Sequence, residues 1–393
     1  MKFFHISDLH IGLKLINRDL EEDQKYIFGK ISDLAAQYKP DAVVIAGDIY
    51  DKAVPSADAV RVFDKFINDL RKAVPDAAIM MISGNHDSAQ RVNCFRGLLS
   101  RQNVYMIGVP PVNEDDHMEK VTLRDAYGNV NFYLLPFVRP SMVRQVVGTD
   151  ENGNSFSYNE TLHRLIARED VDTSERNVLV SHQFYLPAGK KAGDIERMDS
   201  ETRTVGNIDE VTADAISSFD YCALGHIHKP MKVGSDFARY CGTPLCSSVS
   251  EAGQAKGVVM VEMTGKKSGL DKHDYINTTV LPLEPLRQVK VIRGTLDEVL
   301  ADKCDDYVSV VLTDKVEHDV FDMKDRLHDA FPYLLEIRRE SERHATDIGD
   351  SDLAAGTGTA PDPFELCCLF YPEMDDDDRK IMSDVINSVK EAT

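Results

Sequence analysis

Short polar clusters in this sequence contain the side chains that bind divalent metal ions in proteins. The first is Asp8-Leu9-His10, in which a carboxylate and an imidazole stand two positions apart. Residues i and i+2 of a β-strand point to the same face, so this pair is expected to project together from the end of a strand. One carboxylate and one imidazole aimed at one point make half of a metal site. Taken alone, however, the pair is better explained as a capping aspartate and a surface histidine.

Four further clusters each follow an apolar run that is typical of a buried strand. They are Gly47-Asp48-Ile49-Tyr50-Asp51, Gly84-Asn85-His86-Asp87, Ser181-His182 and Gly225-His226-Ile227-His228. Open α/β sheets place their sites at the carboxyl ends of the strands, which is where these clusters would lie. Each is weak by itself, and His182 alone is more typical of a core or surface histidine. Their joint occurrence favours one shared metal centre.

Alternating helix and strand patterns in the first 110 residues supply the elements that would position these clusters. Helices are expected at 19–38, 56–72 and 91–99, and strands at 3–7, 41–46, 77–82 and 104–107. This rhythm predicts parallel strands joined by crossover helices.

From about residue 118 strand patterns dominate. They recur at 121–123, 130–135, 177–181, 220–224, 237–241, 257–263 and 275–281, with one helix at 158–168. We expect a run of antiparallel strands here, so that the first 280 residues form two packed sheets with helices outside them.

Prolines at 282 and 285 indicate a domain boundary. The predicted parts are a first domain at 1–284, a small α+β domain at 285–340, a flexible linker at 341–361 and C-terminal helices at 362–393. The linker is rich in small and polar residues and lacks aromatic ones, so it is not expected to pack. The last segment regains helical periodicity, and we expect its helices to dock onto a partner.

Composition limits the class of protein. The chain has 393 residues and a net charge of −21, and residues 285–393 hold 13 Lys or Arg against 26 Asp or Glu. Such acidity does not by itself indicate nucleic-acid binding, which normally shows as a basic face, unless a partner supplies that face. No apolar run approaches the roughly 18 residues of a membrane span, and the start has no signal-peptide pattern. The seven cysteines form no C-x-x-C pair, which favours a reducing compartment, so a cytoplasmic protein is expected.

Taken in order, D-x-H, G-D-x-x-D, G-N-H-D, a single H and G-H-x-H resemble the calcineurin-like metallophosphoesterase superfamily. The resemblance spans residues 8–228. It implies an α/β fold, namely a four-layer αββα sandwich of two mixed sheets that binds two metal ions. The protein Ser/Thr phosphatases of this superfamily read G-D-x-V-D-R-G and G-N-H-E. This chain has Lys52-Ala53 after Asp51 and Ser88 after G-N-H-D, which argues against a phosphatase.

The resemblance also implies a set of metal ligands. The first metal would take Asp8, His10 and His228, the second would take Asn85, His182 and His226, and Asp48 would bridge the two. The family points to two Mn²⁺ ions, with Mg²⁺, Fe or Zn²⁺ as alternatives, and mixed imidazole and carboxylate ligands suit Mn²⁺, Fe or Zn²⁺ better than Mg²⁺. His86 remains as the catalytic residue, which would protonate or stabilise the leaving 3′-oxygen of a phosphodiester.

Longer stretches resemble the SbcD family of bacterial nuclease subunits. They are ISDLHIG, AGDIYDKAVPS, SGNHDS, VSHQF, FDYCALGHIHKP, RYCGTPLCSSVSE and the domain after Pro285. Thr243 and Val249 depart from residues that the family commonly has. Asp51 stands where archaeal and eukaryotic relatives carry a histidine, so that histidine's role does not transfer.

This resemblance implies a Mn²⁺-dependent DNA nuclease of repair, recombination and replication. It would act as an ATP-dependent exonuclease on duplex ends and as an endonuclease on single strands or hairpins. The implied partners are DNA and an SbcC-type SMC-like ATPase, with a homodimer of this chain inside a heterotetramer or larger complex. The 285–340 domain would cap the DNA. Two alternatives stay open: a hydrolase of small phosphodiesters, which the cap domain disfavours, and a non-catalytic interaction protein, which the full ligand set disfavours.

Overall fold

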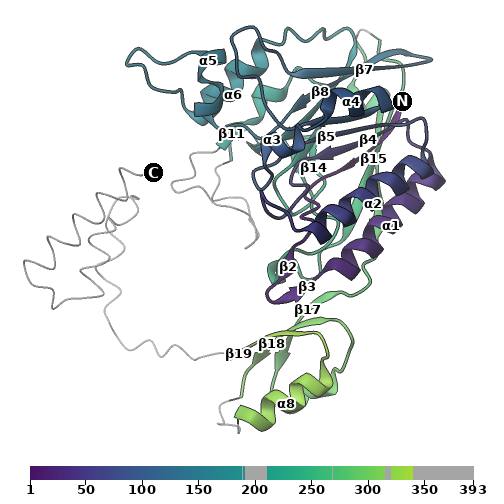
Figure 1. Ribbon diagram of the computed structural model, residues 1–393, viewed down its shortest axis with the longest axis vertical. Helices are drawn as coiled ribbons and strands as arrows, with labels where there is room; N and C mark the ends of the chain where they lie inside the picture. The colour runs from purple at the N-terminus through teal and green to yellow at the C-terminus, as the bar shows by residue number, and fades with distance from the viewer. Residues whose placement is uncertain (188, 191–209, 268, 315–319, 340–393) are drawn as a thin grey trace, which may run out of the picture. The chain divides into compact units, whose positions relative to one another are not determined.

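The computed structural model describes residues 1–187, 189–190, 210–267, 269–314 and 320–339 (Figure 1). The predicted linker at 341–361 and the predicted helices at 362–393 lie outside these described residues. Across the described residues, no helix combines the length and apolar character that crossing a membrane requires.

The first sheet has the strand order β16-β15-β1-β4-β5-β6. Its strands are β1 (Lys2–Ile6), β4 (Ala42–Ala46), β5 (Ala78–Ile82), β6 (Val104–Ile107), β15 (Lys256–Met263) and β16 (Ile276–Leu283). β1, β4, β5 and β6 are parallel, and β15 is antiparallel to both of its neighbours. Helices α1 (Glu21–Tyr38) and α2 (Ala57–Ala73) make the crossovers and lie side by side (Figure 1).

The strands of this sheet are apolar throughout because both of its faces are covered. In β4, Val43 and Ile45 pack in one core cluster with residues of α1 and α2. Val44 and Ala46 point the other way and pack in a second cluster with the second sheet. α2 begins after Ser56, whose hydroxyl accepts a hydrogen bond from the Ala59 amide at 3.1 Å, as an N-cap residue does.

The second sheet has the strand order β13-β14-β12-β9-β8-β7. Its strands are β7 (Glu119–Asp125), β8 (Gly128–Leu135), β9 (Arg176–His182), β12 (Tyr221–Gly225), β13 (Met231–Val233) and β14 (Ser235–Tyr240). Its outer face packs against α6 (Tyr158–Ala167) in a third core cluster. The described residues therefore form the α/β sandwich of two mixed sheets between helices that the sequence predicts.

The expected run of antiparallel strands is wrong for this sheet. β8, β9, β12 and β14 are parallel, whereas β7 and β13 at the edges are antiparallel to their neighbours. Strand direction follows from the connections, and residues 136–175 between β8 and β9 are long enough for a crossover that contains α6.

The single helix expected near 91–99 is also wrong. Two one-turn helices, α3 (Ala89–Val92) and α4 (Arg96–Leu99), replace it, and Phe95 between them has a left-handed backbone with φ of 59°. Asn93 accepts a hydrogen bond from the Gly108 amide at 3.3 Å, which ties the end of α3 to the end of β6 and interrupts the helix.

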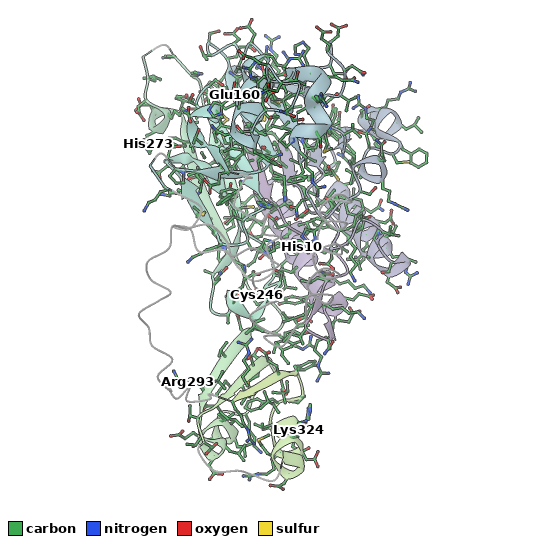
Figure 2. The ribbon with its side chains drawn as sticks, turned by 90° about the vertical axis from the view of Figure 1, so that its left-hand side faces the viewer. His10, Glu160, Cys246, His273, Arg293 and Lys324 are labelled. Atoms are coloured by element: carbon green, nitrogen blue, oxygen red, sulfur yellow. The ribbon has the colours of Figure 1, made fainter. Side chains whose placement is uncertain are left out.

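Residues beyond β16 form a small parallel sheet in the order β17-β18-β19 with a core of its own. Its elements are β17 (Val289–Gly294), α7 (Leu296–Ala301), β18 (Tyr307–Leu312), α8 (Val320–Ala330) and β19 (Leu334–Arg339). This is the predicted β-α-β-α-β order, and Figure 2 shows Arg293 and Lys324 on this part of the chain. Further short strands and helices are β2 (Lys14–Leu15), β3 (Arg18–Asp19), α5 (Arg144–Val147), β10 (Phe184–Leu186) and β11 (Glu210–Thr212).

Candidate metal centre

The five polar clusters meet where β1, β4, β5, β9 and β12 end. Backbone hydrogen bonds join the first two loops, from the Asp8 amide to the Gly47 carbonyl and from the His10 amide to the Asp48 carbonyl, both at 3.0 Å. β1 ends at Ile6, so Asp8 and His10 are not brought together by strand alternation as the sequence suggested. They lie in a loop where both have a left-handed backbone. Asp48 and His226 also have positive φ, and such costly conformations gather at functional sites.

Two glycines let these loops approach one another closely. Gly47 has φ of 89°, and a Cβ there would lie 2.2 Å from the Nδ1 atom of His182. A Cβ on Gly84 would lie 2.1 Å from the Oδ1 atom of Asp48. Any side chain at either position would therefore displace a predicted ligand.

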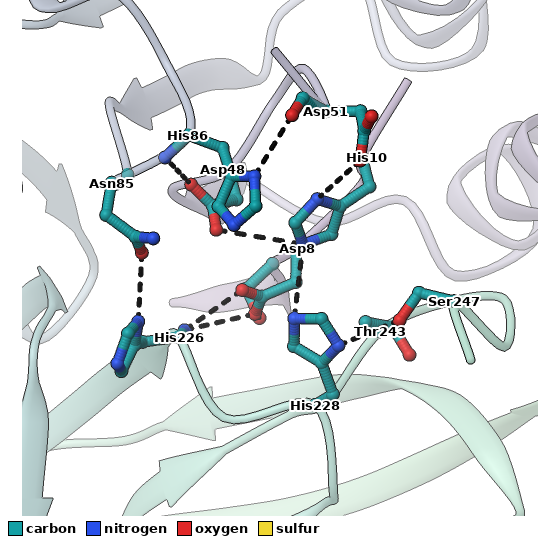
Figure 3. A network of polar contacts seen from close by, with 12 residues as sticks. Asp8, His10, Asp48, Asp51, Asn85, His86, His226, His228, Thr243 and Ser247 are labelled. Atoms are coloured by element: carbon teal, nitrogen blue, oxygen red, sulfur yellow. Dashed lines mark hydrogen bonds and ion pairs between the residues drawn. The ribbon is translucent and has the colours of Figure 1, made fainter. Parts of the chain in front are cut away.

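We call the three predicted ligands Asp8, His10 and His228 the first position. Their ligand atoms lie within 4.8 Å of one another, and all three residues are buried. The Nε2 atoms of His10 and His228 face each other at 3.1 Å (Figure 3). The structure thus brings the predicted first set together at one point.

We call the three predicted ligands Asn85, His182 and His226 the second position. The Oδ1 atom of Asn85 lies 3.0 Å from Nε2 of His182 and 2.9 Å from Nδ1 of His226. One amide oxygen and two imidazole nitrogens therefore converge, as ligands of one cation would. Figure 3 shows the contact of Asn85 with His226.

Asp48 stands between the two positions. Its Oδ2 atom lies 3.3 Å from Nε2 of His182, in the second position, and 3.7 Å from Nε2 of His10, in the first. Its other oxygen, Oδ1, accepts a hydrogen bond from the His86 amide at 2.9 Å. One carboxylate thus contacts both ligand sets.

The electrostatics of the centre favour positive charge. Burial lowers the pKa of His10, but the carboxylates of Asp51, Asp48 and Asp8 outweigh it and raise that pKa to about 9. Burial likewise opposes the protonation of His182, and Asp48 raises its pKa to about 9. A divalent cation would supply the same positive charge, so the residues fit a metal centre by charge as well as by geometry.

His86 lies beside the first position. Its ring stands 4.9 Å from the ring of His10, and its Nδ1 atom lies 3.0 Å from the Asp51 carbonyl oxygen. A ligand atom of His86 also lies within 4.8 Å of ligand atoms of His10 and Asp48. By distance alone it suits either the predicted catalytic role or a place among the ligands, and metal content separates the two.

Two residues that hold the loops have no role in the prediction from sequence. Asp87 accepts hydrogen bonds from the amides of Ile49, Tyr50 and Gly84 at 2.9–3.0 Å, and so ties the loop of Asp48 to that of Asn85. Gln24 of α1 donates to the His10 carbonyl at 2.7 Å and accepts from the Gly12 amide at 3.0 Å. Asp87 could have been predicted, because it is the last residue of the motif G-N-H-D. Gln24 could not, because it is a single polar residue on a helix.

Comparison with known proteins shows the family to which the chain belongs. Residues 1–230 match the model of the calcineurin-like phosphoesterase family. The SbcD subunit of the SbcCD nuclease from Staphylococcus saprophyticus is 31% identical over 307 residues, which cover 77% of this chain and 74% of that protein. The protein of the same name from Staphylococcus epidermidis is 30% identical over 362 residues, which cover 90% of this chain and 89% of that one.

A dimetal phosphatase from Danio rerio is a more distant structural likeness. It has a TM-score of 0.40 and 15% identity, and the match covers 73% of this chain and 98% of that one. This likeness is too weak to add to the assignment. On the family match and the two relatives, the chain belongs to the calcineurin-like phosphoesterase family.

Proposed function

We propose that this chain is a Mn²⁺-dependent nuclease that hydrolyses DNA phosphodiester bonds at a centre of two metal ions. The observation that carries the proposal is the place of Asp48, whose Oδ2 atom faces His182 at 3.3 Å and His10 at 3.7 Å. A single carboxylate between two convergent ligand sets is the arrangement that a bridging ligand needs. The relatives named as nuclease subunits supply the substrate class.

Two bound cations would polarise the phosphate and stabilise the attacking and leaving oxygens. The protein itself would hold the ligand atoms in place through the buried loops that follow the strands. Mn²⁺ is favoured because imidazole nitrogens supply four of the seven ligands that we assign, whereas Mg²⁺ prefers oxygen ligands.

His86 would act on the leaving group. Its backbone amide is anchored on Asp48 and its Nδ1 atom on the Asp51 carbonyl, so that the ring is held beside His10. With Nδ1 protonated toward that carbonyl in the imidazolium form, Nε2–H would donate to the departing 3′-oxygen. An imidazolium can act as a general acid in this way.

We further propose that the chain works as the SbcD-type nuclease component of an SbcC-type complex. An SMC-like ATPase partner would supply much of the DNA-binding surface that this acidic chain lacks. The 285–340 part would cap the DNA, the helices at 362–393 would dock on the ATPase, and a homodimer would stand inside the larger assembly. The complex would serve repair, recombination and replication. Unpaired cysteines among the described residues support a reducing, cytoplasmic setting.

The direct test is cleavage by the purified full chain after EDTA has removed its metal. We expect Mn²⁺ to restore cleavage of single-stranded and hairpin DNA better than Mg²⁺ does, and duplex ends to be cut when the ATPase partner and ATP are added. Preferential hydrolysis of bis-p-nitrophenyl phosphate, with DNA left intact, would instead favour a small-phosphodiester hydrolase. Full activity in EDTA with no bound metal would overturn the two-metal proposal.

A further inference from the structure

A buried polar network lies directly behind His228. Glu251 is fully buried, and its Oε2 atom accepts hydrogen bonds from Lys256 Nζ at 2.6 Å and from Thr243 Oγ1 at 2.8 Å. Its Oε1 atom accepts from the Ser247 amide at 3.2 Å and from the Ser247 hydroxyl. Both carboxylate oxygens are therefore held, and Lys256, itself buried, balances the charge.

This network ends on a predicted metal ligand. Nδ1 of His228 lies 2.8 Å from the Ser247 hydroxyl oxygen and 3.4 Å from Oε1 of Glu251. Because the Ser247 hydroxyl donates to Glu251, its oxygen is left to accept the Nδ1–H of His228. The ring is then fixed with its Nε2 lone pair directed toward the first position (Figure 3).

Among the described residues, the contacts at Nδ1 of the second position's histidines are of a different kind. Nδ1 of His182 lies 2.7 Å from the backbone carbonyl of Ala46, which is a neutral acceptor fixed by β4. Nδ1 of His226 faces Asn85 and so belongs to the ligand cluster itself.

We propose that Glu251 is a positioning residue that acts through Ser247 and His228 to set the metal affinity of the first position alone. Lys256 is its counter-ion, which allows a carboxylate to remain charged in the core. Partners behind a ligand histidine fix its tautomer and its orientation, and losing one typically weakens metal binding 10–100-fold. This inference rests on the proposed two-metal centre and assigns a task to a residue outside the ligand set.

The test variant is Glu251→Gln, measured by Mn²⁺ titration of the metal-free full chain with electron paramagnetic resonance. Donors face both oxygens of Glu251, so the NH₂ group of a glutamine must oppose one set of them. We expect two Mn²⁺ per wild-type chain, and in the variant one Mn²⁺ of unchanged affinity and a second weakened about 10–100-fold. Cleavage by the variant should recover as the Mn²⁺ concentration is raised.

Asp220→Asn is the matched control. Asp220 is a buried carboxylate just before β12, at the end of that strand opposite His226, and it pairs with Lys266 at 2.8 Å and with the Tyr275 hydroxyl at 2.6 Å. Its loss removes a buried charge of the same kind without touching a ligand. We expect this variant to melt at a lower temperature but to bind both Mn²⁺ ions with wild-type affinity.

Variants of Ser247 test the link from Glu251 through Ser247 to His228 without altering the buried charge. Ser247→Ala should weaken the first Mn²⁺ as Glu251→Gln does, whereas Ser247→Thr, which keeps the hydroxyl, should retain wild-type binding. If Glu251→Gln and Ser247→Ala both bind two Mn²⁺ with wild-type affinity, or weaken both ions equally, the inference is wrong. A wild-type chain that binds no Mn²⁺ would refute the proposed function instead.

Discussion

The two halves of the candidate metal centre lie side by side but are supported in different ways. In the first position, His228 is backed by the side chains of Ser247 and Glu251. In the second, His182 is backed by the Ala46 carbonyl, which is part of the first sheet. A backbone carbonyl in a sheet cannot be removed by substitution, whereas a side-chain network can. We therefore expect the first position to be adjustable and the second to be set by the fold.

The largest expected effect comes from a substitution that should weaken metal binding in both halves of the centre. Asp48→Ala takes away the carboxylate that faces both positions, so the metal content should fall at both. Cleavage should drop on the order of 10³-fold or more, because several kcal/mol of transition-state stabilisation depend on the metals. Elemental analysis with a DNA cleavage assay measures both effects. Asp33→Ala, at an exposed site on α1, is the control, and an Asp48 variant that keeps both metals would refute the bridging assignment.

The next substitution, at His86, should reduce catalysis without reducing metal binding. His86→Ala should leave both Mn²⁺ ions bound, while cleavage falls roughly 10²–10⁴-fold, as expected for the loss of a general acid. His117, which is exposed, provides a control for loss of an imidazole elsewhere. If the His86 variant loses a metal ion, His86 is a ligand, and the count of ligands in the first position has to be revised.

A smaller effect should fall on the second position. Asp87→Asn offers one carbonyl oxygen to the amides of Ile49, Tyr50 and Gly84, which Asp87 now binds with two oxygens. Loosening the loop of Asn85 should cost about 1–3 kcal/mol of unfolding free energy. Asp87→Asn should also weaken Mn²⁺ binding in the second position about tenfold, whereas Glu251→Gln should weaken it in the first. Selective weakening of the first position would contradict the division into halves.

The smallest expected effect is on stability, and it concerns a buried contact between the two sheets whose loops supply the ligands. His5 of β1 is buried between the Tyr221 hydroxyl and the Leu224 carbonyl of β12, at 3.1 and 3.2 Å. Burial lowers the pKa of His5 to about 3, with the Leu224 carbonyl opposing and the Arg239 charge adding to the shift.

The lowered pKa of His5 determines how the unfolding free energy changes with pH. The unfolded chain binds a proton at this histidine below about pH 6.5, while the folded chain does not until about pH 3. The unfolding free energy should therefore fall as the pH falls through this window. His5→Gln removes that contribution, so its melting temperature should decline less between pH 7 and pH 4. Parallel curves for the two proteins would show that His5 does not titrate in this way.

The candidate ligands could be located from sequence because each lies at the end of a strand or within a few residues after it, so a short motif marks both the element and the site. Asp8, His10 and Asp48 could be placed in this way. Strand direction could not, because it depends on long connections such as the one between β8 and β9. The role of Glu251 could not be predicted from sequence for a related reason. Its contact with His228 joins residues 23 positions apart, and a buried glutamate carries no local pattern.

Seven side chains are proposed to hold two cations, with Asp48 between them. Anomalous diffraction at the manganese edge, from crystals of the full chain grown with Mn²⁺, would locate both ions. We expect two peaks roughly 3.5–4 Å apart, one between His10 and His228 and the other among Asn85, His182 and His226, with Asp48 contacting both. A single peak, or a second peak that Asp48 does not contact, would rule out this two-metal centre.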